Sequence, residues 1–396
     1  MHPVWWIIGF GLIIRVAAAF FVNAWLPEGL FPDRFTYADA AADVLGGRLI
    51  SSDLVMPLYP LLVALFGGTE VGQVALSVAF GTLSIGAMYL LGSVIYERRQ
   101  AGLIAAALWA LYPPAIFYSA IGLTEIVFTT LLLGLLWSAY SERWWLTAIL
   151  VVAAILVRPA IEVLAIPLVV WFAVVVTRGG WRTAVRAVMA LLVAYLVLMA
   201  PWWAHQHAKY DQFVRLNLGG GVVLYSGNNP LNTSGGGIGG VDVDFSEFAD
   251  IDDPVERDRA LTEAAIDYIR EDPARFVSAT AVKVWRFWRP LPYAPELQSS
   301  AYILGSLLIV PLVVGAITGI VLKRRAFWRL SPLLIVIAYL TAVHAVTIGS
   351  IRYRFPLEPL LILLSVPALL TLLDRYGGSS RRGQHAVPGA TTPEAS

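Results

Sequence analysis

Five ionisable side chains lie within or at the ends of long apolar segments, where a charge is costly. They are Arg15, Glu125, Arg158, Arg352 and Arg354. A charge at the centre of a bilayer costs about 2.5–3.5 kcal/mol on insertion scales, so each is a candidate functional residue. An arginine near a helix end can instead reach the lipid headgroups, and Glu125 can instead stabilise a helix N-terminus. As a group, the last three arginines predict a site for an anionic group, because guanidinium binds phosphate with two hydrogen bonds.

Asp33 is the sharpest candidate for proton transfer. It follows the first apolar segment by a few residues, in the stretch Phe31-Pro32-Asp33-Arg34-Phe35. A carboxylate at the membrane interface can take a proton from an acceptor hydroxyl. Asp is also a common N-cap, and it would serve equally well as the N-cap of a helix that begins at Phe35. The sequence leaves both interpretations open.

The composition places these residues in a membrane protein. Of 396 residues, 58% are apolar and 14% are charged, whereas an average soluble domain has about 45–50% and about 25%. A water-soluble enzyme is therefore excluded. The 28 basic and 27 acidic side chains nearly cancel, so nothing indicates a nucleic-acid partner. The absence of cysteine excludes disulfides and thiolate metal sites.

We expect an all-α polytopic membrane protein with about ten transmembrane helices. A helix needs about 20 mostly apolar residues to cross roughly 30 Å of hydrocarbon. The segments that meet this pattern are 4–26, 71–95, 101–119, 124–140, 144–158, 160–177, 185–203, 301–322, 331–349 and 356–373. A further apolar piece, 56–66, is too short to span and predicts an interfacial or re-entrant helix.

The charges of the connections predict the topology. With the N-terminus inside, the inner connections and tail hold 13 bases and four acids, while the outer segment 27–70 has six acids and two bases. The outer segment 204–299 has 14 acids and nine bases. The positive-inside rule therefore predicts a multi-pass protein of a bacterial cell membrane with both termini in the cytoplasm. Two short helices, at 253–270 and 274–289, are expected in the second outer segment, the latter along the membrane surface.

These patterns divide the chain into four parts. The N-terminal transmembrane module is 1–203 and contains the outer segment 27–70. The extracytoplasmic region 204–299 follows, then the C-terminal transmembrane helices in 300–376. The polar tail 377–396 is expected to be disordered.

Four stretches, in order along the chain, resemble the membrane-embedded GT-C glycosyltransferases. The resemblance is to the branch of the protein-O-mannosyltransferases and aminoarabinose transferases. The stretches are 32–41 with 57–60, then 111–125, then 201–230 and finally 352–359. Members of this branch transfer a sugar from a polyprenyl-phosphate carrier to a hydroxyl on the outer face, usually with inversion. The resemblance implies the same donor here, with a glycan, lipid or protein as acceptor.

The resemblance also assigns roles to residues. The essential first-loop Asp of the branch matches Asp33 as general base, although the Glu that often follows it is replaced by Arg34. Arg352 and Arg354, with Arg158 as a weaker third, would bind the donor phosphate. The other substrate-binding candidates are Glu125, Asp39, Tyr59, Asn228 and Asn229. Because the carrier is itself a good leaving group, no cofactor or metal is expected.

A lipid or solute transporter would use the same intramembrane charges and is the alternative function. Transporters usually contain repeated halves with paired broken helices, and no matching halves stand out here. One long outer segment, 204–299, favours an enzyme that works on one side of the membrane.

Overall fold

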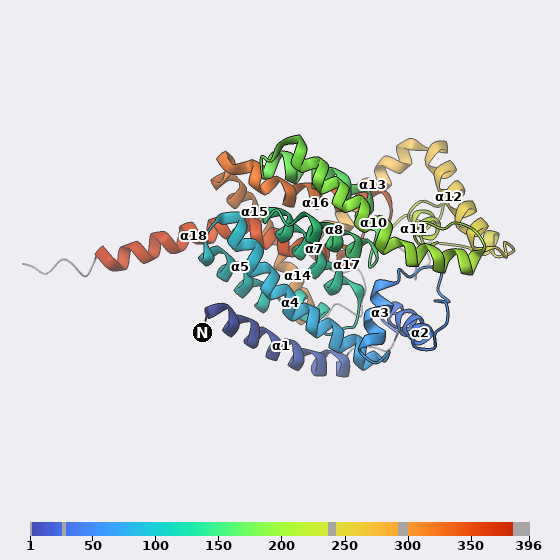
Figure 1. Cartoon of the computed structure of the whole chain (residues 1–396), viewed down its shortest axis with the longest axis horizontal. Coiled ribbons are helices and arrows are strands. Elements are labelled where there is room, and N and C mark those ends of the chain that lie inside the picture. The colour runs from blue at the N-terminus through green and yellow to red at the C-terminus, as the bar shows by residue number, and fades with distance from the viewer. Residues whose placement is uncertain (1, 26–28, 237–242, 292–299, 383–396) are drawn as a thin grey trace, which may run out of the picture.

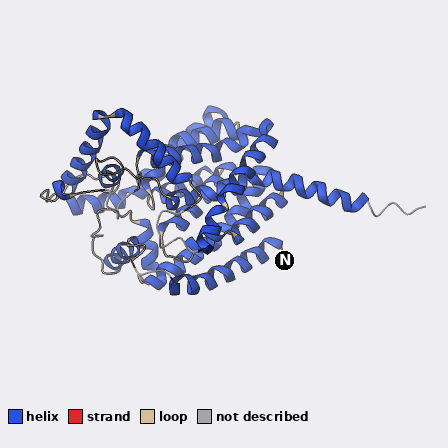
Figure 2. Cartoon of the chain, turned by 180° about the vertical axis from the view of Figure 1, so that it is seen from behind, coloured by secondary structure: helices blue, strands red, loops and turns tan. Residues whose placement is uncertain are grey.

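The computed structural model describes residues 2–25, 29–236, 243–291 and 300–382, and within these ranges it contains helices and loops but no strand (Figure 2). The expected all-helical polytopic architecture is confirmed. Seven helical segments are long and apolar enough to cross a membrane. They are 3–24, 70–96, 159–176, 180–210, 303–322, 324–346 and 351–374.

Shorter apolar helices take the places of the third, fourth and fifth predicted spans. These are α5 (Arg99–Leu111), α7 (Thr124–Tyr140) and α8 (Trp144–Ile155). The main α-helices of the seven long segments are α1 (Pro3–Trp25), α4 (Glu70–Tyr96), α9 (Glu162–Trp171), α10 (Gly180–Tyr210), α15 (Ile309–Leu322), α16 (Phe327–Val346) and α18 (Glu358–Arg382). Large apolar side chains such as Trp6 and Phe20 of α1 are exposed, as expected of a surface that faces lipid.

Both long connecting segments lie at one end of the helix bundle, which we call the loop end (Figure 1). The N-terminus of α1 and the far end of α18 lie at the opposite end. The first connecting segment carries α2 (Asp33–Leu45) and α3 (Leu58–Leu65). The second carries α11 (Gly220–Gly227), α12 (Pro254–Glu271) and α13 (Pro273–Trp288). Helix α18 continues through Arg382, into the tail that was expected to be disordered, and residues 383–396 lie outside the described part.

The second connecting segment has a small core of its own. Tyr225 of α11 packs with Phe248, Leu261 and Ala265. Helix α12 begins where the sequence predicts, because the Asp253 carboxylate accepts a hydrogen bond from the amide of Val255 at 2.8 Å. The segment is therefore a folded unit rather than an extended loop.

Helix α13 packs against α16. Lys283 and Phe287 on its inner side are fully buried, while Val277 and Trp285 on its outer side are 67% and 64% exposed. The expectation that this helix only lies along a membrane surface is therefore incomplete, because one side of it belongs to the protein interior.

Arg15 of α1 is explained by a break between two helices. Helix α5 ends before Pro113 and Pro114, which begin α6 (Pro113–Tyr118). Proline has no amide hydrogen, so the carbonyls of Trp109 and Ala110 lose their usual helical partners. The Arg15 guanidinium donates to these two carbonyls at 3.3 and 3.2 Å and is fully buried. Arg15 therefore joins α1 to the broken end of α5.

This arrangement predicts that Arg15→Met destabilises the protein. The Trp109 carbonyl keeps the amide of Tyr112 at 3.4 Å, but the Ala110 carbonyl loses its partner. A carbonyl left without a partner in an apolar interior costs about 1–3 kcal/mol, so the midpoint of thermal unfolding in detergent should fall. Arg98→Met is the matched control, because Arg98 is exposed and its nearest carboxylate oxygen, on Asp374, is 3.9 Å away. Equal midpoints for the two variants would contradict this role of Arg15.

Candidate active site

Four charged residues from distant parts of the sequence meet at the loop end. Arg352 Nη2 lies 2.7 Å from Asp33 Oδ2. The Nε atom of Arg352 donates to Glu125 Oε1. Arg158 Nη2 donates to the same oxygen at 2.6 Å. We call Asp33, Glu125, Arg158 and Arg352 the charge cluster.

The buried member of the charge cluster is Glu125. Its side chain is 0% exposed, compared with 17% for Arg158, 18% for Arg352 and 44% for Asp33. Two guanidinium groups share one carboxylate oxygen, Oε1, while Oε2 has no hydrogen-bond partner among the described residues. The cluster is electrically balanced, with two carboxylates facing two guanidinium groups, and Oε2 of Glu125 is a buried acceptor without a partner among the described residues.

The local backbone conformation orients the side chains of Glu125, Arg158 and Arg352. Gly122 adopts a φ of +68°, in the left-handed region that favours glycine, and turns the chain into α7, whose first turn carries Glu125. Arg158 is extended because it precedes Pro159. Ser350 caps α17 (Ile351–Arg354) by accepting from the amide of Arg352.

The structure excludes Asp33 as the N-cap of a helix beginning at Phe35. Asp33 is itself the first residue of α2, and the capping position is Pro32. Its carboxylate is therefore free to face Arg352 while remaining partly open to solvent. The acidic charge in the first turn also suits the positive end of the helix dipole.

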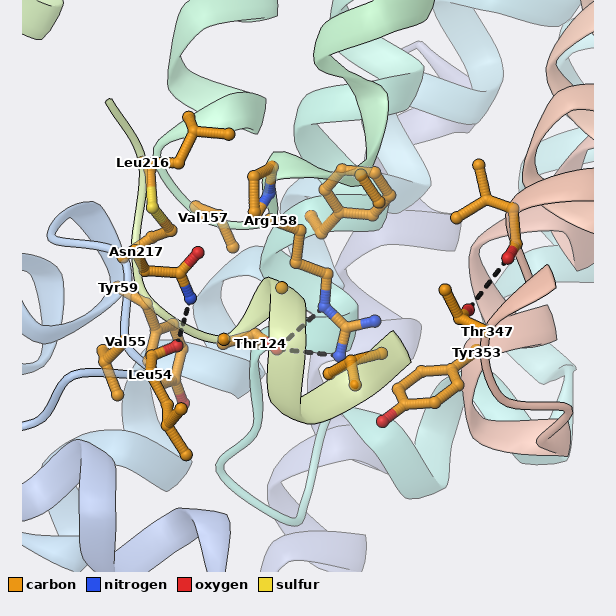
Figure 3. A pocket seen from close by; sticks show the side chains of 18 of the residues that line it. Leu54, Val55, Tyr59, Thr124, Val157, Arg158, Leu216, Asn217, Thr347 and Tyr353 are labelled. Atoms are coloured by element: carbon orange, nitrogen blue, oxygen red, sulfur yellow. Dashed lines mark hydrogen bonds between the residues drawn. The ribbon is translucent and has the colours of Figure 1, made fainter. Parts of the chain in front are cut away.

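A cavity of about 410 Å³ lies beside the charge cluster. Thr124 and Arg158 belong to its wall, and Arg158 donates to Thr124 Oγ1 through Nε at 3.0 Å and Nη2 at 2.9 Å (Figure 3). Apolar side chains form most of the remaining wall, among them Val55, Phe128, Val157, Val223, Leu340 and Val343. The cavity is therefore largely apolar, with charge at one place on its wall.

Two tyrosines line the cavity next to the cluster. Tyr59, a predicted site residue, packs edge-on against Tyr37 with the ring centroids 4.8 Å apart. Burial, followed by the nearby Asp33 carboxylate, raises the pKa of Tyr37 to about 12, so its hydroxyl stays protonated. Tyr37 was not predicted, although its position four residues after Asp33 places both on one side of a helix.

Tyr353 and His344 also escaped the sequence analysis. Their rings stack with centroids 4.7 Å apart, and the Arg158 guanidinium lies over the Tyr353 ring. Both residues line the cavity. His344 is a titratable residue within the largely apolar helix α16, so it carries the same signal as the arginines of the apolar segments, although it was not predicted.

Four predicted site residues are not brought to the cluster. Arg354 is 1% exposed and pairs with Glu358 at 3.0 Å, and it also donates to the carbonyl of Arg289 at 2.8 Å. Asp39 is exposed on α2. Asn228 and Asn229 are buried, and their side-chain amides donate to backbone carbonyls of the second connecting segment and of α16. Within the described residues, no three His, Asp or Glu side chains gather as a metal site.

No protein-family model and no curated protein sequence matches the chain. Solved structures of the oligosaccharyltransferase of Archaeoglobus fulgidus are similar in fold. The apo form has a TM-score of 0.58 at 13% identity, covering 98% of this chain and 53% of that one. The complex with an inhibitory peptide and a dolichol-phosphate has a TM-score of 0.57 at 12% identity, covering 99% and 53%. The chain is thus similar in fold to these oligosaccharyltransferase structures and spans about half their length.

Glu125→Gln is expected to destabilise the protein much more than Asp33→Asn. Removing one partner of a buried ion pair costs about 3–5 kcal/mol, because the remaining charges are left buried without compensation. A half-exposed pair such as Asp33–Arg352 contributes about 0–1 kcal/mol. Thermal unfolding of both variants in detergent tests the difference, and similar midpoints would show that Glu125 does not hold the cluster together.

Proposed function

We propose that the protein is a membrane glycosyltransferase that moves a sugar from a polyprenyl-phosphate carrier to a hydroxyl acceptor. The observation that carries this proposal is the charge cluster beside a largely apolar cavity, with Arg158 in the cavity wall. An apolar cavity suits the first isoprene units of a lipid carrier, and arginines suit its phosphate. The structural neighbour bound to a dolichol-phosphate and a peptide supports a lipid-phosphate donor.

The donor phosphate binds beside Arg158. Two nitrogens of this guanidinium are engaged by Thr124 and Glu125. The third, Nη1, has no hydrogen bond within the described residues, and Arg158 lies on the cavity wall. A phosphate there accepts from Nη1 and, as the glycosidic bond breaks, its growing negative charge is stabilised by Arg158 and Arg352.

Asp33 is the general base. Its carboxylate is the most exposed group of the charge cluster, and Arg352 holds it in place by an ion pair to Oδ2. Oδ1 takes the proton of the acceptor hydroxyl, which attacks the anomeric carbon on the face opposite the phosphate, so the configuration inverts. Glu125 is fully buried and does not line the cavity, so its role in this proposal is to hold the two guanidinium groups in place rather than to touch substrate.

The loop end faces away from the cytoplasm in this proposal. The connections at the opposite end are rich in arginine and lysine, whereas both segments at the loop end carry excess acid. The acceptor therefore meets the donor on the extracytoplasmic side. Arg354, Asn228 and Asn229 support the site through the backbone rather than by touching substrate.

Asp33→Asn is expected to abolish transfer while the protein stays folded, because the amide cannot accept the proton. General base catalysis contributes roughly 100- to 10,000-fold in rate. Purified protein in liposomes, a panel of radiolabelled polyprenyl-phosphate sugars and a mixed hydroxyl acceptor pool would measure the rate. Asp267→Asn, on the exposed face of α12, is the matched control.

Near-normal transfer by the Asp33→Asn variant would exclude this base. Movement of labelled lipid across the liposome bilayer, with no acceptor and no transfer in the wild type, would instead favour a transporter.

Arg158→Met should weaken binding of the donor, and the protein should stay folded at reduced stability because Arg352 still pairs with Glu125 Oε1. Hydrogen bonds to a charged group contribute about 1.5–3 kcal/mol, so the dissociation constant for a polyprenyl-phosphate should rise by about ten- to one-hundredfold. Binding of farnesyl phosphate to the detergent-solubilised protein measures this directly. Arg259→Met, whose side chain on α12 is 68% exposed, should bind as the wild type does, and equal affinity in both variants would place the phosphate elsewhere.

A further inference from the structure

Arg352 is presented by a very short element. Helix α17 has four residues and follows the connection 347–350, which has no helical structure. A single helical turn is not stable by itself, so the position of Arg352 depends on what surrounds this connection. The surroundings belong almost entirely to the second connecting segment.

Three close backbone approaches hold the connection. The amide of Gly349 donates to the carbonyl of Gly235 at 3.1 Å. A Cβ on Gly227 would lie 1.9 Å from the carbonyl oxygen of Thr347, and one on Gly349 would lie 2.3 Å from the carbonyl oxygen of Lys283. Only glycine allows backbones to come this near. Helices α11 and α13 therefore enclose the connection between α16 and α17.

Among the described residues of α11 and α13, which enclose the connection 347–350, Lys283 is the only charged side chain with 0% exposure. Its Nζ donates to Asn228 Oδ1 at 2.8 Å and to the carbonyl of Val346, the last residue of α16, at 3.1 Å. Asn228 Nδ2 donates to the same carbonyl at 2.9 Å. One ammonium group thus joins α13, the end of α11 and the end of α16.

The burial of Lys283 is not explained by ion pairing. Its partners are an amide and a carbonyl, and burial lowers the pKa of its ammonium to about 8. An apolar side chain of similar length would avoid this desolvation cost. Unlike an apolar side chain, Lys283 fixes the relative orientation of α11, α13 and α16, because its hydrogen bonds form in one arrangement of these helices.

We infer that Lys283 is a positioning residue that sets Arg352 against Asp33 and Glu125. This inference rests on the proposed function, in which Arg352 orients the base and stabilises the phosphate. Val346 lies six residues before Arg352, and Ser350, which caps α17, lies between them. A small displacement of the connection moves the guanidinium away from both carboxylates, and such displacements are costly at a catalytic site.

Arg354 also joins α17 to α13, at a point that follows Arg352 in the chain. It donates to the carbonyls of Phe287 and Arg289 at 3.2 and 2.8 Å, at the C-terminal end of α13. Helices α13 and α17 are therefore joined both before and after Arg352. This explains why two arginines only two residues apart have different surroundings.

A double-mutant cycle tests whether Lys283 acts through Arg352. Lys283→Met, Arg352→Met and the double variant are prepared as full-length protein in detergent, and the dissociation constant for farnesyl phosphate is measured. We expect Lys283→Met to raise the dissociation constant about tenfold in the wild-type background and less than twofold in the Arg352→Met background. Lys283→Arg, which keeps the donors, should recover most of the affinity.

Lys209→Met is the matched control. Lys209 joins the first connecting segment to α10 through Asp53 at 2.8 Å, so it also carries a lysine hydrogen bond at the loop end. Its removal should leave the affinity unchanged in both backgrounds. A tenfold effect of Lys283→Met that persists without Arg352 would mean a general structural role and would overturn the inference.

Hydrogen exchange gives a readout that needs no ligand. In the Lys283→Met protein, the amides of Gly349 and Arg352 should exchange at least tenfold faster, while those of α4 and α7 should not change. Should Lys283→Met fail to fold, Lys283→Gln takes its place in both measurements. Unchanged exchange at Gly349 and Arg352 would overturn the inference even if Asp33→Asn abolishes transfer. Faster exchange in a protein that neither binds farnesyl phosphate nor transfers sugar would support the positioning and reject the proposed function.

Discussion

One buried carboxylate holds the functional end of this protein together. Glu125 is fully buried at the first turn of α7, and its Oε1 accepts from both Arg158 and Arg352. In a low-dielectric setting, neither guanidinium could be kept at this depth without a nearby negative charge. Arg352 is in turn joined to Asp33 of the first connecting segment. Segments more than 200 residues apart are thereby tied to one side chain.

The charge balance of the cluster also explains how it can remain ready for a ligand. Two guanidinium groups face two carboxylates, so the site is neutral before an anion arrives. Glu125 is the fully buried member of the cluster, whereas Asp33 is half-exposed and Arg158 lies on the cavity wall. In the proposed reaction, an entering phosphate would meet a fixed hydrogen-bond donor on Arg158 and would not have to break the buried pair. Preorganisation of this kind is what lets electrostatic stabilisation act at the moment of bond breaking.

The sequence predicts the helices and the identity of the charge cluster better than it predicts the surroundings of each charge. A charge in an apolar segment is a local property, so Glu125, Arg158 and Arg352 could be recognised without coordinates. What satisfies such a charge is not local. Arg15 has the same signature, yet its partners are carbonyls freed by Pro113 and Pro114.

The separate positions of Arg352 and Arg354 have a simple geometric cause. Residues two apart on a helix point in nearly opposite directions, so a pair with this spacing cannot face one site. Arg352 points to the cluster and Arg354 to the end of α13. The sequence does not reveal this difference, because α17 is only four residues long and shows no helical pattern.

Lys283 shows that the hydrophobicity pattern of a helix is not enough to predict which of its side chains face the protein interior. The residues of α13 alternate between apolar and basic in the way that is typical of a helix at a membrane surface. In the structure the basic residue Lys283 faces inward and the apolar residues Val277 and Trp285 face outward. An inward lysine is tolerated only because Asn228 and the end of α16 supply its partners. The fold of the second connecting segment and the position of Arg352 are therefore linked, because Lys283 binds the end of α16 six residues before Arg352.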